Sequence, residues 1–340
     1  MKYLLCSTAL LIAGPAFADG ELKIYNWFEY MPQELVDKFE AETGITVTTD
    51  TYDSNEAMLA SLKAGKLGEY DLAVPGDFMV GIMADEGLLD SYTPEEMPNF
   101  ANIAPQWLDV PFDMGRTHSI PYQWGTTAFS VNRDMFAGDI SSLGIIFNPP
   151  PELQGKINVL DSQNEVLVLG SLYLGIPQCS TDRAQLQALS DMLVNAKQYW
   201  ASFGSDTAKD VLVSGDAAAG MIYNGFSAKA RAEGANIEYS YPTEGNVLWM
   251  DNMVLLADAP NRANALLFMN FLLEPENAAA LTNYAAYTSG VVGVEPFLDD
   301  AIRNSPENNP PADATPGAFV QACDQETQQL YDAIWTNLKK

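Results

Sequence analysis

Four short segments of this sequence set aromatic rings beside acidic or amide side chains, or close to one another. They are Trp27-Phe28-Glu29-Tyr30, Tyr223-Asn224-Gly225-Phe226, Trp249-Met250-Asp251 and Tyr284-Ala285-Ala286-Tyr287. Aromatic faces attract ammonium groups and cover methylene groups, each cation–π contact giving ~0.5–2 kcal/mol. Carboxylates form charge-assisted hydrogen bonds with the same nitrogens. Together the segments indicate a site for an organic cation, although core packing is the alternative for each one alone.

Residue types needed for common catalytic and metal-binding motifs are scarce. The sequence holds one histidine, His118, and no GxSxG, HExxH, P-loop or GxGxxG pattern. One histidine and few cysteines are too few ligands for a soft-metal site. Two alternatives stay open, a secreted hydrolase using a carboxylate pair and ferric-ion capture through Tyr284, Tyr287 and carboxylates. We expect neither enzymatic chemistry nor a cofactor.

The charge balance narrows the class of partner. The chain has 17 Lys+Arg against 45 Asp+Glu. Nucleic acid is excluded as a partner, because phosphate binding requires basic patches. Cationic partners are favoured by long-range attraction. The alternative is an acidic surface that serves only solubility in a salty medium.

The first 18 residues have the features of a secretory leader. Lys2 is followed by a mostly apolar stretch over residues 3–14, and Ala16-Phe17-Ala18 fits the small-x-small cleavage pattern. We expect a soluble mature chain from Asp19, with an uncleaved anchor as the alternative. Two cysteines remain in that chain, Cys179 and Cys323. An exported compartment and an even count favour one disulfide, against two buried free thiols.

The segments that must position these residues are predicted to alternate between strand and helix. Three segments are predicted strands: residues 22–25, 45–49 and 71–75. Pro32 opens a helix that Gly44 ends. Asp53 and Glu56 form a predicted capping box for a helix over 57–64. This order predicts an α/β domain with mainly parallel strands.

The second half repeats this alternation without a flexible linker. Strands are predicted over residues 157–160, 217–223 and 247–256, and helices from 165, over 186–196, over 261–273 and near the C-terminus. Because no Gly/Ser-rich linker separates the halves, we expect two lobes joined by strands. The segments 124–132 and 251–257 are the candidate crossovers.

Several motifs carry a resemblance to a known family. They are Tyr25-Asn26-Trp27-x-Glu29-Tyr30, Asp71-Leu72-x-Val74-Pro75, Tyr223-Asn224-Gly225 and Trp249-Met250-Asp251. Over nearly all of the mature chain the sequence resembles the periplasmic spermidine/putrescine-binding proteins of ABC transporters. The resemblance implies the type II periplasmic-binding-protein fold, with two α/β lobes and ligand in the cleft between them. The implied lobes are residues 19–127 with 252–300, and 128–251 with 301–340.

The resemblance also implies ligand-binding positions. Those from the first lobe are Trp27, Phe28, Glu29, Tyr30, Asp77 and Phe78, and the others are Glu165, Tyr223, Trp249, Asp251, Tyr287 and Gln321. Phe28 replaces a family hydroxyl, Gly76 replaces a common serine, and Phe226 replaces an aspartate of putrescine-selective members. Glu165 also completes a predicted capping box with Ser162, which is its structural alternative.

Physical reasoning agrees with these positions, because an unpaired ammonium in a closed cleft is costly. We expect Asp251 and one of Glu29 or Glu165 to hold opposite ammonium ends. An aromatic box around the methylene groups is expected from Trp27, Tyr30, Trp249 and Tyr287. The predicted protein is a monomer in the periplasm that delivers a polyamine to an inner-membrane ABC permease.

Overall fold

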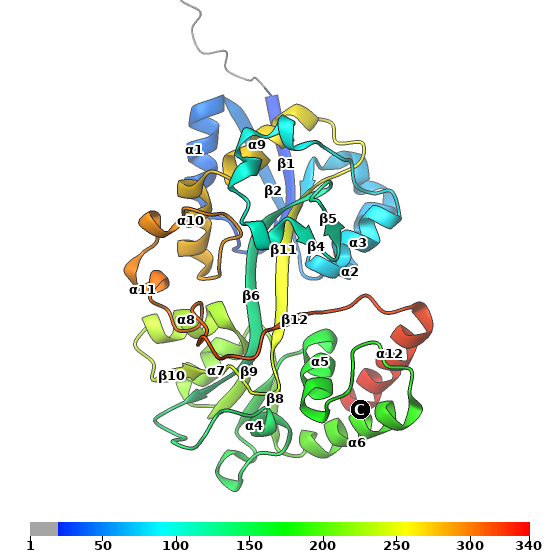
Figure 1. Ribbon diagram of the computed structural model, residues 1–340, viewed down its shortest axis with the longest axis vertical. Coiled ribbons are helices and arrows are strands. Elements are labelled where there is room, and N and C mark those ends of the chain that lie inside the picture. Colours follow the sequence, from blue (N-terminus) through cyan, green and yellow to red (C-terminus); the bar gives the residue numbers. More distant parts are fainter. Residues whose placement is uncertain (1–19) are drawn as a thin grey trace, which may run out of the picture.

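The computed structural model describes residues 20–340, so the predicted leader lies outside the described residues. Figure 1 shows two α/β lobes with the long strands β6 and β11 running between them. β6 (Ser119–Asn132) and β11 (Val247–Leu255) pair with each other antiparallel. They contain most of the two predicted crossovers, so the lobes are joined by paired strands, as expected. No helix within residues 20–340 is long and apolar enough to span a membrane.

The bounds of the remaining strands and helices are as follows. The other strands are β1 Gly20–Trp27, β2 Ile45–Tyr52, β3 Leu72–Ala73, β4 Asp109–Val110, β5 Asp113–Met114, β7 Ile157–Val159, β8 Trp200–Phe203, β9 Ala219–Tyr223, β10 Ile237–Tyr239 and β12 Ala318–Phe319. The helices are α1 Gln33–Thr43, α2 Asn55–Ser61, α3 Asp77–Asp85, α4 Gly144–Phe147, α5 Gln163–Leu174, α6 Arg183–Lys197, α7 Ala208–Ser214, α8 Asn224–Ala232, α9 Arg262–Leu272, α10 Pro275–Ala285, α11 Asp300–Arg303 and α12 Gln325–Lys339.

The first lobe is built on β2, β1, β3 and the upper part of β11. β1 pairs in parallel with both β2 and β3, which confirms the predicted pairing. Gly44 ends α1 in the left-handed conformation with φ 77°. The predicted cap of α2 is wrong by one residue, because the Ser54 hydroxyl accepts from the Ala57 N–H. Ser54 has the extended backbone that this contact requires, with φ −155° and ψ 155°.

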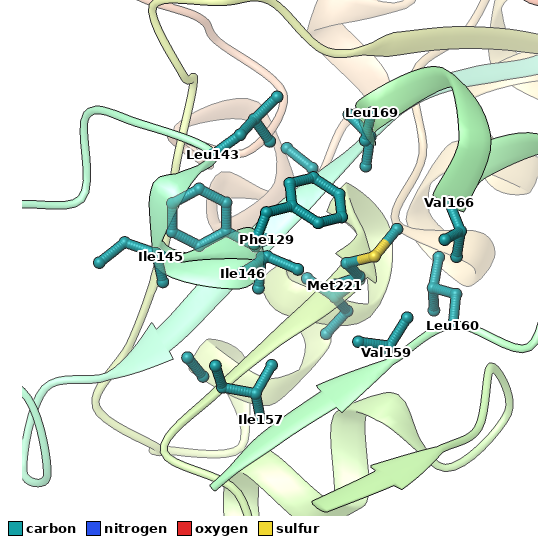
Figure 2. Close-up of a cluster of buried hydrophobic side chains, with 14 of the residues drawn as sticks. Phe129, Leu143, Ile145, Ile146, Ile157, Val159, Leu160, Val166, Leu169 and Met221 are labelled. Atoms are coloured by element: carbon teal, nitrogen blue, oxygen red, sulfur yellow. The ribbon is translucent and has the colours of Figure 1, made fainter. Parts of the chain in front are cut away.

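The second lobe is built on β9, β7 and β8, and its core fixes α5. β7 pairs in parallel with β8 and β9, while β9 and β10 pair antiparallel with β6. Val166 and Leu169 on α5 belong to the buried hydrophobic cluster of Figure 2, together with Phe129, Ile157 and Met221 from the strands. Burial of that apolar face fixes α5 against the strands of the second lobe.

The C-terminal segment returns to the second lobe. Tyr331, Ile334 and Leu338 of α12 join the same core cluster as residues of the second lobe. A disulfide joins Cys179 to Cys323, so the predicted bridge is confirmed and the two thiols are not free. The lobe boundaries expected at residues 127/128, 251/252 and 300/301 stay predictions.

Candidate functional site

Four aromatic side chains and one carboxylate meet where the two lobes join, and we name them the interlobe cluster. Its members are Tyr30, Tyr223, Trp249, Asp251 and Tyr287. The Tyr287 ring lies 6.1 Å from the Tyr30 ring and 4.8 Å from the Trp249 ring, measured between centroids. Tyr223 lies 6.1 Å from Trp249. The Tyr30 hydroxyl donates a 2.9 Å hydrogen bond to Asp251 Oδ2.

The members come from four separate elements. Tyr30 follows β1, Tyr223 ends β9, and Tyr287 comes two residues after the end of α10. Trp249 and Asp251 alternate with Met250 on the crossover strand β11. Carboxyl ends of strands and the segments after them present ligand contacts in open α/β sheets. The cluster therefore unites residues from both lobes through β11.

Two glycines permit the rings to approach the backbone. A Cβ on Gly225 of α8 would lie 2.5 Å from Tyr287 Cε1, and a Cβ on Gly125 of β6 would lie 2.5 Å from Trp249 Cζ2. Neither ring could keep its place against a larger residue. The glycine in the Tyr223-Asn224-Gly225 motif thus has a packing reason.

Asp251 is the carboxylate at the centre of the cluster. Burial raises its pKa from 3.8 to about 7, the Tyr30 hydrogen bond lowers it, and the charge of Glu165 raises it further. No ion pair within residues 20–340 includes Asp251. Asp251 is half-buried, and a carboxylate that is partly removed from water without a counter-ion is costly. Such a group is suited to receive a cation from outside the chain.

Glu165 brings a second carboxylate from the other lobe. It lies in the first turn of α5 and is half-buried. Burial raises its pKa, the Ser162 hydrogen bond lowers it, and the charge of Glu56 raises it. The predicted capping box is wrong, because the Ser162 side chain caps no helix N–H group and its hydroxyl instead donates to Glu165 Oε2.

Asp77 has a different environment from the one its predicted ligand role suggests. Its side chain is buried, and Oδ1 accepts from the Phe78 N–H at 2.6 Å. Oδ2 accepts from the Met250 N–H at 3.0 Å, directly before Asp251 on β11. Burial raises its pKa to about 8, while these two N–H groups lower it. Asp77 therefore ties α3 to the strand that carries Asp251, and the half-buried Phe78 lies next to it.

The residues of the Trp27–Tyr30 segment have different surroundings. The Trp27 indole N–H donates to the Val74 carbonyl at 2.8 Å, and its ring packs on Tyr52 at 4.6 Å. Phe28 is 72% exposed. Glu29 is exposed and has a positive φ of 50°. Only Tyr30 of this segment is a member of the interlobe cluster.

Gln321 lies apart from the other predicted positions. It is exposed, its N–H donates to Gln178 Oε1 at 3.0 Å, and its carbonyl oxygen lies 3.7 Å from the sulfur of Cys323. None of its described hydrogen bonds reaches the cluster. The bridge thus holds Gln321 beside Gln178.

Sequence reasoning missed neighbours of the cluster. The Tyr122 hydroxyl donates to the Tyr30 carbonyl at 2.8 Å, and the two rings are 5.2 Å apart. Asn55 Oδ1 accepts from the Gly76 N–H at 3.0 Å, and Gly76 forms an isolated bridge with Asp251. The position of Tyr122 just before the predicted crossover was a usable signal. No sequence signal indicated Asn55, because its partner Gly76 is distant in sequence.

The described residues offer little for a metal ion. Within residues 20–340 no group of three or more His, Cys, Asp or Glu side chains is arranged to hold one. Tyr284 is 41% exposed. Burial, and then the charge of Asp251, raise the pKa of Tyr287 well above its ordinary value, which opposes the tyrosinate form that iron binding requires.

Comparisons with known proteins assign the chain to a family. The family profile described as bacterial extracellular solute-binding protein matches residues 34–310. The chain belongs to this family. Membership confirms the predicted class of protein and its two-lobed α/β fold.

Three relatives illustrate how closely this solute-binding protein matches others. It is 33% identical over 342 residues to the spermidine/putrescine-binding periplasmic protein of Escherichia coli, covering 99% of this chain and 98% of that protein. It is 31% identical to the putrescine-binding periplasmic protein SpuD of Pseudomonas aeruginosa, covering 96% and 95%. The solved spermidine/putrescine ABC transporter substrate-binding protein of Streptococcus pneumoniae superposes with a TM-score of 0.84 at 30% identity, covering 94% and 99%.

Proposed function

We propose that this solute-binding protein captures a polyamine at the interlobe cluster. The observation that carries the proposal is Asp251, a carboxylate surrounded by aromatic rings and without a cationic partner among the described residues. An alkyl ammonium group supplies the missing charge, and the rings cover the methylene groups beside it. The names of the relatives point to the same ligand class.

Asp251 and Glu165 are the two carboxylates proposed to hold opposite ammonium groups. Both have a raised pKa, and the charge of Glu165 acts on Asp251. Glu29, the other candidate, is exposed and would give a weak, screened interaction. Tyr30, Tyr223, Trp249 and Tyr287 form the proposed box around the methylene groups. Trp27 and Phe78 are proposed to border it.

The proposed role is transport without chemistry. A ligand that contacts both lobes stabilises the arrangement in which they approach each other, because only then are both carboxylates paired. The closed protein, a monomer in the periplasm, delivers its ligand to an ABC permease in the inner membrane. The family assignment supports this role.

Calorimetry and thermal-shift measurements test the proposal directly. Purified protein is titrated with putrescine, cadaverine, spermidine, amino acids and Fe(III). A polyamine at 100 times its dissociation constant is expected to raise the unfolding free energy by about 2.7 kcal/mol. Absence of heat and of thermal shift with all three amines contradicts the proposal. A coloured complex with Fe(III) alone supports ferric-ion capture instead.

A further inference from the structure

Arg116 is a fully buried arginine that contacts both strand neighbours of Asp251. It lies between β5 and β6 and is 0% exposed. Because side chains of a strand alternate between its two faces, Met250 and Asn252 of β11 lie on the face opposite to Asp251. Arg116 Nη2 donates to the sulfur of Met250 at 2.9 Å, and Nη1 donates to Asn252 Oδ1 at 2.6 Å. Asn252 Nδ2 also donates to the Met250 carbonyl at 2.8 Å. One guanidinium group thus holds the far side of the strand that carries the central carboxylate.

The other hydrogen bonds of Arg116 are also with uncharged groups. Its Nε donates to the Trp107 carbonyl at 2.7 Å, and Nη1 donates to the Ser119 hydroxyl at 3.1 Å. No ion pair within residues 20–340 includes Arg116. Burial lowers its pKa to about 10, so the group keeps its charge at neutral pH. A charge buried without an acidic partner is costly, so stability alone does not explain its presence.

The ladder between β11 and β6 is irregular beside these contacts. Asp251 pairs with Gln123, but Asn252 pairs with Pro121, so β6 has one extra residue between the two pairs. A β-bulge of this kind disrupts the local hydrogen bonds of the ladder and re-aims the side chains beside it. Regular strand pairing therefore does not fix the direction of the Asp251 side chain, and the contacts of Arg116 lie where that pairing is interrupted.

We propose that Arg116 is a positioning residue that holds the bulged part of β11 so that the Asp251 carboxylate faces the interlobe cluster. The inference rests on the proposed polyamine function. Asp77 fixes the backbone of the strand through the Met250 N–H at 3.0 Å, whereas Arg116 fixes the side chains on either side of Asp251. A binding group needs such support, because displacement by a fraction of an ångström weakens a directed contact.

A double-mutant cycle measures this positioning role. Arg116→Met keeps an apolar side chain in the buried space and removes the hydrogen bonds to β11, so putrescine affinity is expected to fall at least tenfold by calorimetry. In the Asp251→Asn background the same replacement is expected to change affinity less than threefold, because the carboxylate that Arg116 positions is then absent. Arg133→Met is the matched control and should leave affinity within twofold of wild type. Arg133 donates to Glu238 at 2.5 Å and to the Gly138 carbonyl at 2.7 Å, neither of which lies in β11.

Two further variants keep the result independent of a packing defect at one residue. Asn252→Ala removes the acceptor of the 2.6 Å hydrogen bond and should reproduce the loss of affinity, again only when Asp251 is present. Arg116→Lys keeps the charge and one donor, and its affinity should lie between those of wild type and Arg116→Met. All proteins are measured below their thermal midpoints, and if Arg116→Met does not fold, the cycle with Asn252→Ala decides.

The outcomes separate the role of Arg116 from the proposed function. Equal losses of putrescine affinity in the wild-type and Asp251→Asn backgrounds overturn the positioning role, because a general packing defect does not depend on the carboxylate. An unchanged affinity in Arg116→Met overturns it as well. If the wild-type protein binds no polyamine, the proposed function itself fails.

Discussion

The Tyr30 hydroxyl donates a 2.9 Å hydrogen bond to Asp251 although the two residues are 221 positions apart. The bond connects the turn after β1 to the crossover strand β11. Burial, and then the charge of Asp251, raise the pKa of Tyr30 well above its ordinary value, so the phenol keeps its proton and remains a donor. One carboxylate oxygen is thus satisfied while the negative charge stays available for a ligand.

Replacing Asp251 by Asn removes that charge and little else. We expect putrescine affinity to fall about 100-fold or more, because one ammonium group would be left without its counter-charge. The ligand-free protein should be at least as stable as wild type, since an amide is less costly to bury than an unpaired carboxylate. Calorimetry and urea denaturation measure the two effects.

Asp258→Asn is the control for this change. Asp258 is exposed and has a positive φ of 59°, a conformation that Asn tolerates. It should leave affinity and stability unchanged. Unaltered affinity in Asp251→Asn would show that the Trp249-Met250-Asp251 motif is structural only.

Asp77 is expected to act through the backbone of β11. Asp77→Ala leaves the N–H groups of Phe78 and Met250 without their acceptors, at a cost of about 1–3 kcal/mol each. Asp77→Asn keeps one acceptor and should lie between wild type and Asp77→Ala in unfolding free energy. Putrescine affinity should follow the same order, because Met250 directly precedes Asp251. Equal stability of all three proteins would contradict this role.

The raised pKa values of Asp251 and Asp77 predict opposite pH effects on stability and binding. Asp251 and Asp77 titrate at about 7 and about 8 when folded, against ~3.9 for an unfolded aspartate. At pH values between the unfolded and the folded pKa values, the folded protein binds more protons than the unfolded chain. The unfolding free energy of the ligand-free protein should therefore fall as pH rises. Diamines stay fully charged here, because alkyl ammonium groups titrate near pH ~10.4.

Putrescine affinity should instead rise about tenfold from pH 6 to pH 8, as Asp251 gives up its proton. Urea denaturation and calorimetry across this range measure both trends. The stability slope should be shallower in Asp251→Asn. Affinity that is flat with pH would argue against direct pairing of ligand with this carboxylate.

Gly225→Ala tests the close approach of α8 to Tyr287. The added Cβ would lie 2.5 Å from the Tyr287 ring, which must move. Displacement of the ring should weaken putrescine binding about tenfold, equivalent to roughly 1.4 kcal/mol. Gly170→Ala is the control, because its Cβ would meet the flexible ends of Leu189, Met192 and Leu193 at 3.0, 3.2 and 3.5 Å. Similar affinities in both variants would remove the packing argument.

The disulfide is expected to stabilise the second lobe without taking part in binding. Cys179 and Cys323 are 144 residues apart, so their bridge restricts a long loop in the unfolded chain. The Cys179→Ser, Cys323→Ser double variant should lose about 2–5 kcal/mol of unfolding free energy. Denaturation with and without reductant measures this loss. Putrescine affinity below the unfolding range should stay within twofold of wild type, and a larger decrease would place the bridge in the binding mechanism.

Local sequence features predicted much of the fold because their causes are local. Pro32 and Gly44 bound α1 through the backbone angles they favour. The absence of a Gly/Ser-rich linker predicted lobes joined by strands, and the extended segments near Trp124 and Asp251 were the candidate crossovers, which β6 and β11 contain in large part. The prediction of Asp53 as the N-cap of α2 was wrong because Ser54, the next residue, is an equally good cap.

Residue type also predicted several of the side chains that the structure brings together. Trp249 and Asp251 were singled out as a ring close to an acid, and Tyr287 as a ring close to Tyr284; all three lie in the interlobe cluster. The sequence by itself therefore determined the family, the kind of ligand to test and the strand that carries the central carboxylate.

Only the tertiary structure decided how each acid is used. Asp77 gives both oxygens to backbone N–H groups, while Asp251 keeps its charge unmatched and Glu29 is exposed to solvent. These differences arise from partners far away in the chain. The burial and pairing of an acidic side chain depend on which segments pack together. Spacing along the sequence does not show which segments these are.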